Sequence, residues 1–295
     1  MRLAPIVLFV YNRLWHTKQT VEALQKNELA KDSELIIFSD APKTDKHKKP
    51  VYEVREYIKT ISNFKNITII ERDKNWGLAN SIIDGITKIV NKYGKIIVLE
   101  DDLVTSQFFL TFMNEALEMY KNDKRVVSIH GYVYPIANLP DLFFLRGADC
   151  WGWATWMRGW AIFEADGKKL LSELKSKKLQ KDADFSGSYG FTRMLKNQIK
   201  GKNDSWAIRW YFSTYLRNML TLYPGKSLVR NIGMDNSGRH SLKTKTFDTK
   251  TVDHIRIERI EVRESREDRK KFEHFFKIAK GSAFKRTKQR IKTFL

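Results

Sequence analysis

The chain has 295 residues, enough for one large domain or two small ones, and its 42% hydrophobic residues can form a sizeable core. A single cysteine, Cys150, excludes an internal disulfide framework and any cysteine-rich zinc site. No apolar run reaches transmembrane length and no secretory signal is expected, so a cytoplasmic protein is the default prediction. The net charge of +20 indicates an anionic partner such as a nucleic acid, a nucleotide or an acidic membrane surface.

The first 131 residues alternate short apolar runs with segments of helical spacing. The predicted strands are residues 6–11, 34–39, 66–70, the apolar run within residues 95–103, and residues 126–130. The predicted helices are residues 17–24, 51–61, 77–90 and 106–120. Residues 43–49 are predicted to form a charged loop. This alternation predicts βαβ units, and therefore an α/β fold built on a doubly wound parallel sheet.

The pattern is less regular beyond residue 131. Short strands are predicted at residues 143–145, 220–224 and 227–232, and helices at residues 168–181, 204–218 and 265–279. Four tryptophans lie between residues 151 and 160, and most of them are expected in the core. Residues 235–240 are predicted to form a loop.

Residues 95–103 carry the strongest functional signal. Their apolar run predicts a strand buried on both faces, and Glu100, Asp101 and Asp102 follow it directly. Open α/β sheets bind ligands at the carboxyl ends of their strands, so these acids are expected at the ligand-binding edge. Adjacent carboxylates repel one another, which favours a divalent metal that holds a phosphorylated substrate. The alternative is that the acids cap the next helix, although Ser106 is itself a suitable cap.

Arg13 and Asp40 follow the first and second predicted strands, so they are expected at the same edge as the acids. An arginine suits a phosphate, and a carboxylate suits a base or a ribose hydroxyl. The alternative is that both are ordinary solvated loop residues. No glycine-rich dinucleotide fingerprint or Walker loop accompanies them, which argues against the NAD-binding and P-loop classes.

Several motifs, in this order, resemble the GT-A glycosyltransferases. They are Pro5-Ile6-Val7, Arg13, Trp76-Gly77-Leu78-Ala79, Leu99-Glu100-Asp101-Asp102-Leu103 and Phe108-Phe109. The nearest resemblance is to the N-acetylglucosaminyltransferase I type, in which a Glu-Asp-Asp triplet replaces the usual Asp-x-Asp. The later segments Gly152-Trp153, 204–210 and 231–240 look like bacterial sugar transferases of the same group. The resemblance covers roughly residues 4–241.

The resemblance implies an inverting transferase that moves a hexosyl or N-acetylhexosaminyl unit from a nucleotide-sugar donor to a hydroxyl of a glycan or lipid-linked acceptor. It implies a UDP-sugar as the expected donor, Mn²⁺ or Mg²⁺ as the cofactor, and a place in bacterial surface polysaccharide synthesis. Residues 1–131 would form the nucleotide-sugar-binding half, and residues 132–241 the acceptor-binding and catalytic half of the same GT-A domain. Residues 242–295 would form a basic tail.

The same resemblance suggests roles for individual residues. The expected donor contacts are Arg13 at the diphosphate, Asp40 at the base, Glu100 and Asp101 at the sugar and ribose hydroxyls, Ser237 in a closing loop, and Asn75 and Asn80 beside the Trp76-Gly77 motif. Asp102 would bind the metal, and His240 would either join it or be a solvated loop residue. Trp151 or Trp153 would stack on a sugar.

Asp204 is the expected catalytic base, because an inverting transfer needs one group to take the proton of the acceptor hydroxyl. Ser205 stands where the relatives have a second acid, so the assignment has alternatives. Asp204 would otherwise be the N-cap of its helix, and Asp149 and Glu164 are reserve candidates for the base.

The C-terminal segment mixes basic and apolar residues. Phe272, Phe275, Phe276 and Ile278 lie among lysines, and basic residues recur beyond Gly281. Such a segment either lies on an anionic membrane surface, which would place the protein on the cytoplasmic face, or is a solvated tail.

Two other functions remain open at this point. A nucleic-acid-binding protein would explain the charge, but acids at the ligand-binding edge disfavour that partner. A relative that binds a nucleotide without turnover would retain the same motifs.

Overall fold

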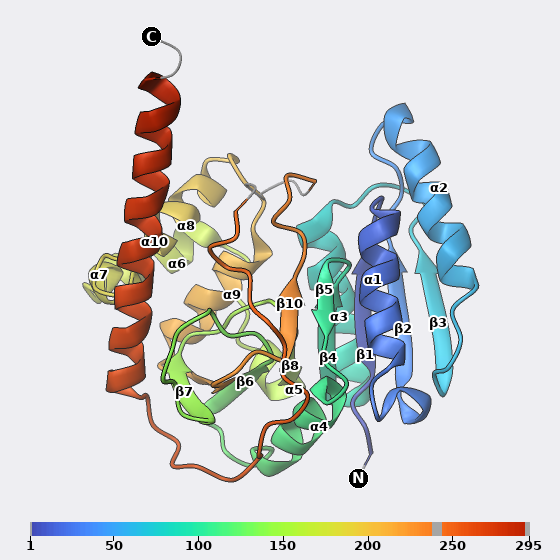
Figure 1. The fold of residues 1–295 in the computed structure, drawn as a ribbon, viewed down its shortest axis with the longest axis horizontal. Coiled ribbons are helices and arrows are strands. Elements are labelled where there is room, and N and C mark those ends of the chain that lie inside the picture. The colour runs from blue at the N-terminus through green and yellow to red at the C-terminus, as the bar shows by residue number, and fades with distance from the viewer. Residues whose placement is uncertain (1, 238–243, 293–295) are drawn as a thin grey trace.

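A central sheet with helices on both faces organises the molecule, and the computed structural model describes residues 2–237 and 244–292 of it (Figure 1). The strands are β1 (Ile6–Val10), β2 (Glu34–Ser39), β3 (Asn66–Glu71), β4 (Lys95–Glu100), β5 (Leu103–Thr105), β6 (Val126–His130), β7 (Leu142–Arg146), β8 (Trp153–Trp156), β9 (Leu220–Pro224) and β10 (Val229–Asn231). The helices are α1 (Leu14–Gln25), α2 (Asp45–Lys59), α3 (Leu78–Tyr93), α4 (Phe109–Met119), α5 (Met157–Trp160), α6 (Gly167–Ser176), α7 (Gln180–Ala183), α8 (Phe191–Ile199), α9 (Trp206–Tyr215) and α10 (Arg266–Lys292), with a 3₁₀ turn at Ala30–Asp32.

The large sheet has the strand order β3-β2-β1-β4-β8-β6-β9-β7. Strands β1 to β4 are parallel to one another, and β6 and β9 run in the same direction. Strands β7 and β8 run in the opposite direction. The predicted α/β class with a mostly parallel sheet is therefore confirmed.

Alternating side chains of the central strands enter two separate cores. On β4, Ile97 and Leu99 pack with α1, α2 and α4, whereas Ile96 and Val98 pack with α3, α5 and α9. All four are almost completely buried, as predicted for a strand covered on both faces. The layers place helices before and behind the sheet and leave the ends of its strands for a site (Figure 1).

Strand β8 was not predicted, because its Trp-rich segment has no period-two alternation. It inserts between β4 and β6 and is antiparallel to both, so all four of its residues are buried. The sheet is therefore not a simple βαβ series after β4. One sheet takes strands from both sides of residue 131, and the assignment of the two halves to donor and acceptor stays a prediction.

Two further corrections concern charged segments. The loop predicted at residues 43–49 is wrong from Asp45 on, because α2 begins there with an acid in its first turn, and Pro50 lies inside the helix. The single helix predicted over residues 168–181 is interrupted after α6, where Lys178 takes a left-handed backbone with φ of 55°.

Helix α10 begins where predicted but is longer, and its apolar face covers the core. Phe272 and Phe276 are each 1% exposed, and they contact Tyr134 and Phe185. These aromatic residues are thus unavailable to a membrane, which corrects the prediction for this part of the tail. Among the described residues, no helix is both long and apolar enough to cross a bilayer.

Candidate active site

The acids and Arg13 meet at the point where the strand order reverses. Strand β1 pairs with β2 on one side and with β4 on the other, and such a switch point is where open α/β sheets hold ligands. Arg13 follows β1, and its Nη2 donates to the carboxylate of Asp101 and to Asp102 Oδ2, the latter at 2.8 Å. The cation expected between the acids is thus partly supplied by the protein itself.

Negative charge at this cluster exceeds what Arg13 neutralises. Burial alone would lower the pKa of Arg13, but the charges of Asp101 and Asp102 raise it above its ordinary value. The side chain of Glu100 has no hydrogen bond or ion pair among the described residues, and burial together with the charges of Asp102 and Asp101 raises its pKa to about 8. The site therefore favours a further cation or a proton.

The backbone around the acids is fixed by neighbouring segments. The Thr20 hydroxyl on α1 donates to the Asp101 carbonyl at 2.9 Å, and the Ile232 amide donates to the Asp102 carbonyl at 2.9 Å. A Cβ at Gly233 would lie 2.0 Å from Asp102 Oδ2, so only glycine allows this approach. The alternative that the acids cap the next helix is wrong, because β5 lies between them and α4. Ser106 does not cap α4 with its side chain either.

The ribbon formed by β5 and β10 brings the loop at residues 232–237 to the acids. His16 Nε2 on α1 lies 3.0 Å from Asp235 Oδ2 and 3.3 Å from the Ser237 hydroxyl. Burial opposes ionisation of Asp235, but hydrogen bonds from Ser237 and the neighbouring His16 lower its pKa to about 2. Ser237 thus lies at the predicted edge, whereas His240 lies outside the described residues.

Asp40 holds the segment before α3. Its Oδ1 accepts from the amides of Ala41 and Trp76 at 2.9 Å each. Its Oδ2 accepts from the Gly77 amide at 2.9 Å and from Asn75 Nδ2 at 3.1 Å. Both carboxylate oxygens of Asp40 are therefore engaged within the protein. The predicted contact of Asp40 with a nucleotide base stays a prediction. We call this arrangement the Asp40 clamp.

The two predicted asparagines also serve this segment. Asn75 Nδ2 donates to the Ala41 carbonyl at 2.7 Å, and Asn80 Nδ2 donates to the Trp76 carbonyl at 3.0 Å. Their contacts with a nucleotide sugar remain predictions.

Asp204 lies beside the clamped segment. Its Oδ2 would be 3.9 Å from a Cβ at Gly77, and its side chain is 46% exposed. The alternative role as N-cap is wrong, because the Ser205 hydroxyl caps α9 by accepting from the Ile208 amide at 3.2 Å. Nη2 of the buried Arg209 lies 3.7 Å from Asp204 Oδ1 and holds that carboxylate at the start of α9.

The reserve candidates differ in position. Asp149 accepts from the Cys150 amide at 2.8 Å and lies 3.5 Å from the Tyr134 hydroxyl. Burial raises the pKa of Cys150 well above its usual range, and the charges of Asp149 and Glu100 add to this rise. Glu164 instead forms an ion pair with Lys169 at 2.5 Å.

The two tryptophans expected to stack on a sugar are in different environments. Trp153 is 0% exposed and packs against Trp160, Trp206 and Trp210. The prediction that Trp153 stacks on a sugar is therefore wrong. Trp151 is half-buried, with its ring 4.7 Å from that of Tyr132. Its contact with a sugar stays a prediction.

The donor set fits a hard divalent ion. Glu100, Asp101 and Asp102 offer only oxygens, and their charge exceeds that of Arg13. In the described ranges, no three or more His, Cys, Asp or Glu side chains are arranged to enclose a metal. Mg²⁺ is commonly bound through one or two carboxylates, with substrate phosphates and water as its remaining ligands.

Comparison with known families finds a match for the N-terminal half. Residues 6–140 match the sequence profile described as Glycosyl transferase family 2. These residues are similar to family 2 glycosyltransferases. The predicted GT-A resemblance is thereby confirmed, and the matched region contains Arg13, Asp40 and the three acids. No curated protein matches the chain.

Solved structures give weaker similarities. A mannosyltransferase, PcManGT from Pyrobaculum calidifontis in complex with GDP-Man and Mn²⁺, has 14% identity and a TM-score of 0.34 over 45% of this chain and 36% of that one. S. aureus TarS 1-349 has 10% identity and a TM-score of 0.39 over 76% and 59%. The S. aureus TarS crystal structure has 11% identity and a TM-score of 0.42 over 78% and 37%. The chain thus spans less than two thirds of each of these three proteins, and the likeness to family 2 rests on the sequence profile.

Three residues at the acids were not predicted from the sequence: His16, Asp235 and Gly233. His16 follows Arg13 by three positions, and the other two lie just before or within a predicted loop. A histidine one helical turn after a candidate phosphate ligand was a usable signal for His16. The approach of Gly233 to Asp102 depends on the β5–β10 ribbon, which no local pattern predicts.

Proposed function

We propose that the protein is an inverting, metal-dependent glycosyltransferase that moves a sugar from a nucleotide-sugar donor to an acceptor hydroxyl. The observation that carries this proposal is the Arg13–Asp101–Asp102 cluster at the switch point of the region that matches family 2. It combines a phosphate-binding side chain with excess carboxylate at one edge.

The donor would lie across the ends of β1, β2 and β4. Arg13 would shift its hydrogen bonds toward the donor diphosphate, and Glu100 and Asp101 would accept from sugar and ribose hydroxyls. Ser237, in the loop anchored on His16, would approach the diphosphate from the other side. UDP is the proposed nucleoside diphosphate.

Asp102 would hold Mn²⁺ or Mg²⁺, with His240 as a second candidate. Such an ion neutralises the negative charge that develops on the leaving nucleoside diphosphate. The residues of the chain have the remaining tasks: to orient the donor, to bind the acceptor, and to take a proton.

Asp204 would remove the proton of the acceptor hydroxyl as that oxygen attacks the anomeric carbon. The new glycosidic bond forms while the bond to the diphosphate breaks on the opposite face, which inverts the configuration. The position of Asp204 beside Gly77 supports this role, because the clamped segment links it to the donor edge. Trp151 would present its ring to a sugar of the acceptor.

The acceptor would be a glycan or a lipid-linked sugar used in bacterial surface polysaccharide synthesis. A peripheral position on the cytoplasmic face of the membrane would suit a lipid-linked acceptor. The basic residues beyond Gly281 would supply the charge for that contact.

The test measures nucleotide release from a panel of nucleotide sugars with and without Mn²⁺, followed by transfer to glycan acceptors. We expect Asp204→Asn to bind the donor nearly as well as the wild type but to turn over roughly 10²–10⁴-fold more slowly. Asp253→Asn, at an exposed position, is the matched control. Near-normal turnover of Asp204→Asn would transfer the role of base to Asp149. Donor binding without hydrolysis or transfer by the wild type would indicate a non-catalytic relative.

A further inference from the structure

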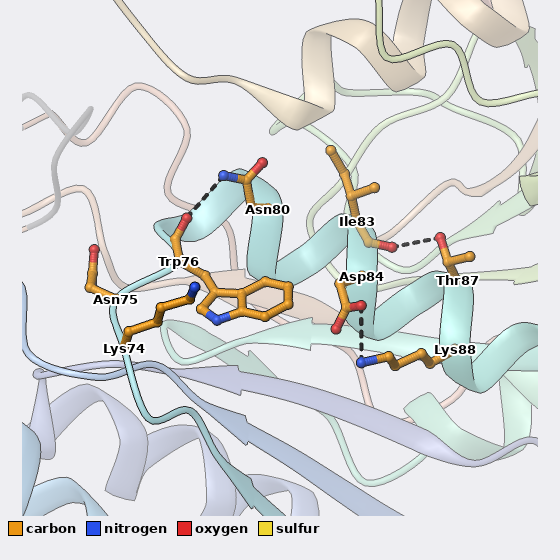
Figure 2. A pocket seen from close by; sticks show the side chains of 8 residues that line it. All are labelled: Lys74, Asn75, Trp76, Asn80, Ile83, Asp84, Thr87 and Lys88. Atoms are coloured by element: carbon orange, nitrogen blue, oxygen red, sulfur yellow. Dashed lines mark hydrogen bonds and ion pairs between the residues drawn. The ribbon is translucent and has the colours of Figure 1, made fainter.

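A pocket of about 670 Å³ lies along the outer side of α3, and neither Arg13 nor the acids line it (Figure 2). It begins at Asn75 and Trp76, next to the Asp40 clamp, and extends along about three helical turns of α3 to Lys88. Its volume lies within the range of small-ligand sites, roughly 300–1,000 Å³. The pocket therefore opens beside the segment that lies next to Asp204 and leads away from the strand ends.

The indole of Trp76 is held in a fixed position in this pocket. The Arg72 guanidinium carbon lies 4.0 Å from the ring centroid, and Arg72 is only 7% exposed. Arg72 in turn donates to Asp84 Oδ2 at 2.5 Å. The half-buried ring adjoins Ile83, so the pocket offers an apolar, rigid surface of the kind that receives the C–H face of a pyranose.

Positive charge is in excess at the same pocket. Asp84 is shared between Arg72 and Lys88, whose Nζ lies 3.1 Å from Asp84 Oδ1. Lys74 has no ion-pair partner within the described part of the chain. Figure 2 shows Lys74 and Lys88 on opposite sides of the indole. An anionic group on the ligand would therefore meet a cation on either side of the ring.

The pocket has polar groups suited to hydroxyls as well. The exposed Asn80 amide caps its upper end, where its Nδ2 donates to the Trp76 carbonyl and its oxygen is available as an acceptor. Thr87 accepts from the Trp160 indole at 2.9 Å, so the lower wall is tied to the core. Such a preformed site loses little conformational freedom when a ligand binds.

We propose that this pocket binds a negatively charged sugar unit of the acceptor glycan, with the pyranose against Trp76 and its anionic group directed to Lys74 or Lys88 at the side of the ring. The inference rests on the proposed function for the identity of the ligand as acceptor. The binding site itself rests on the pocket, the fixed indole and the unbalanced charge. It makes the protein selective for an acidic glycan at a position outside the catalytic edge.

The experiment is calorimetric titration of the full chain with a tetrasaccharide of alternating glucuronic acid and N-acetylglucosamine. The uncharged N-acetylglucosamine tetrasaccharide, a neutral oligosaccharide that carries a phosphomonoester, and inorganic phosphate are the comparison ligands. We expect both anionic oligosaccharides to bind more tightly than the neutral one, with a preference between them that identifies carboxylate or phosphate as the natural group. Binding should weaken as salt rises.

The variant Lys74→Gln/Lys88→Gln should bind the anionic tetrasaccharide roughly 3- to 30-fold more weakly, as expected for two exposed charge contacts. Trp76→Phe, which retains a ring, should lose less than Trp76→Leu. Lys92→Gln, one turn further along α3 and outside the pocket, should bind like the wild type.

Equal binding of the neutral and anionic tetrasaccharides, or unchanged binding by the double lysine variant, would overturn the proposal. Binding of inorganic phosphate as tightly as the oligosaccharides would also overturn it, because the pocket would then be an anion site without a sugar platform. Donor binding is measured in the same preparation. If the donor binds and the tetrasaccharides do not, only this inference is wrong; if no nucleotide sugar binds, the proposed function is wrong.

Discussion

Replacing Asp40 with asparagine tests whether the Asp40 clamp shapes the site. Each carboxylate oxygen of Asp40 accepts hydrogen bonds from two N–H groups. Asp40→Asn replaces one of these oxygens with an amide nitrogen, which cannot accept, so two N–H donors lose their acceptor in either orientation of the amide. A donor left unsatisfied costs about 1–3 kcal/mol. Asp40 is 7% exposed but the 75–77 segment is half-buried, so water compensates in part and we expect a loss of roughly 2–4 kcal/mol in the free energy of unfolding.

Urea unfolding followed by circular dichroism measures this loss. Asp32→Asn is the control, at an exposed position whose side chain has no partner among the described residues. The control should remain within about 0.5 kcal/mol of the wild type. Turnover should also fall in Asp40→Asn, because Gly77 lies beside Asp204. Unchanged stability together with an altered preference among nucleotide bases would refute the clamp and support the direct contact with the base.

Three other predictions concern the acids and the tail. A UDP- or dTDP-sugar should bind more tightly with Mn²⁺, and calorimetry of Asp102→Ala should show that this gain is lost; equal donor affinity with and without metal in the wild type would contradict the assignment. Because the folded-state pKa of Glu100, about 8, lies above its ordinary value of 4.5, its stabilising contribution is complete below pH 4.5 and is lost as pH rises through 8. In thermal melts, the Glu100→Gln variant should therefore lose less stability between pH 6 and 9 than the wild type does. The control variant Glu115→Gln, at an exposed position, should lose as much as the wild type. Ending the chain at Gly281 should preserve the fold and donor hydrolysis but weaken sedimentation with anionic vesicles, and equal sedimentation would place any membrane contact elsewhere.

The first half of the fold was predictable because its strands are short, apolar and fully buried. The predicted bounds of β2 and β6 match the structure, since turn residues end each run. Strand β8 was missed because tryptophans and small residues alternate there in no regular way, and its pairing partners are distant in sequence. Pairing between distant segments is the information that local periodicity lacks.

The candidate site shows the same division. Parallel strands end at one edge, so the gathering of Arg13 with Asp101 and Asp102 followed from strand order alone. The direct ion pairs did not follow, since they depend on side-chain reach across β1 and β4. Asp40 was placed at the correct edge, but the Trp76 and Gly77 amides that engage its oxygens come from a turn whose geometry the sequence did not reveal.

The amphipathic pattern of α10 was detected correctly and interpreted wrongly. Apolar residues at helical spacing indicate a buried face but do not say what buries it. In the structure, Phe272 and Phe276 enter the aromatic cluster with Tyr134, and Arg269 forms an ion pair with Asp182 at 3.2 Å. The protein's own core, rather than a lipid surface, covers this face.

This packing changes what a membrane contact by the tail would require. Since the first half of α10 is fixed to the body, the basic residues after Gly281 do not hang from a flexible linker but continue a helix whose direction is set. Figure 1 shows that helix projecting beyond the rest of the molecule at the top of the view, the side at which β1 to β4 end. Five basic residues follow Gly281, and each contributes on the order of 1 kcal/mol near an anionic surface. A contact made there would turn the catalytic edge toward the membrane, the orientation that transfer to a lipid-linked acceptor requires.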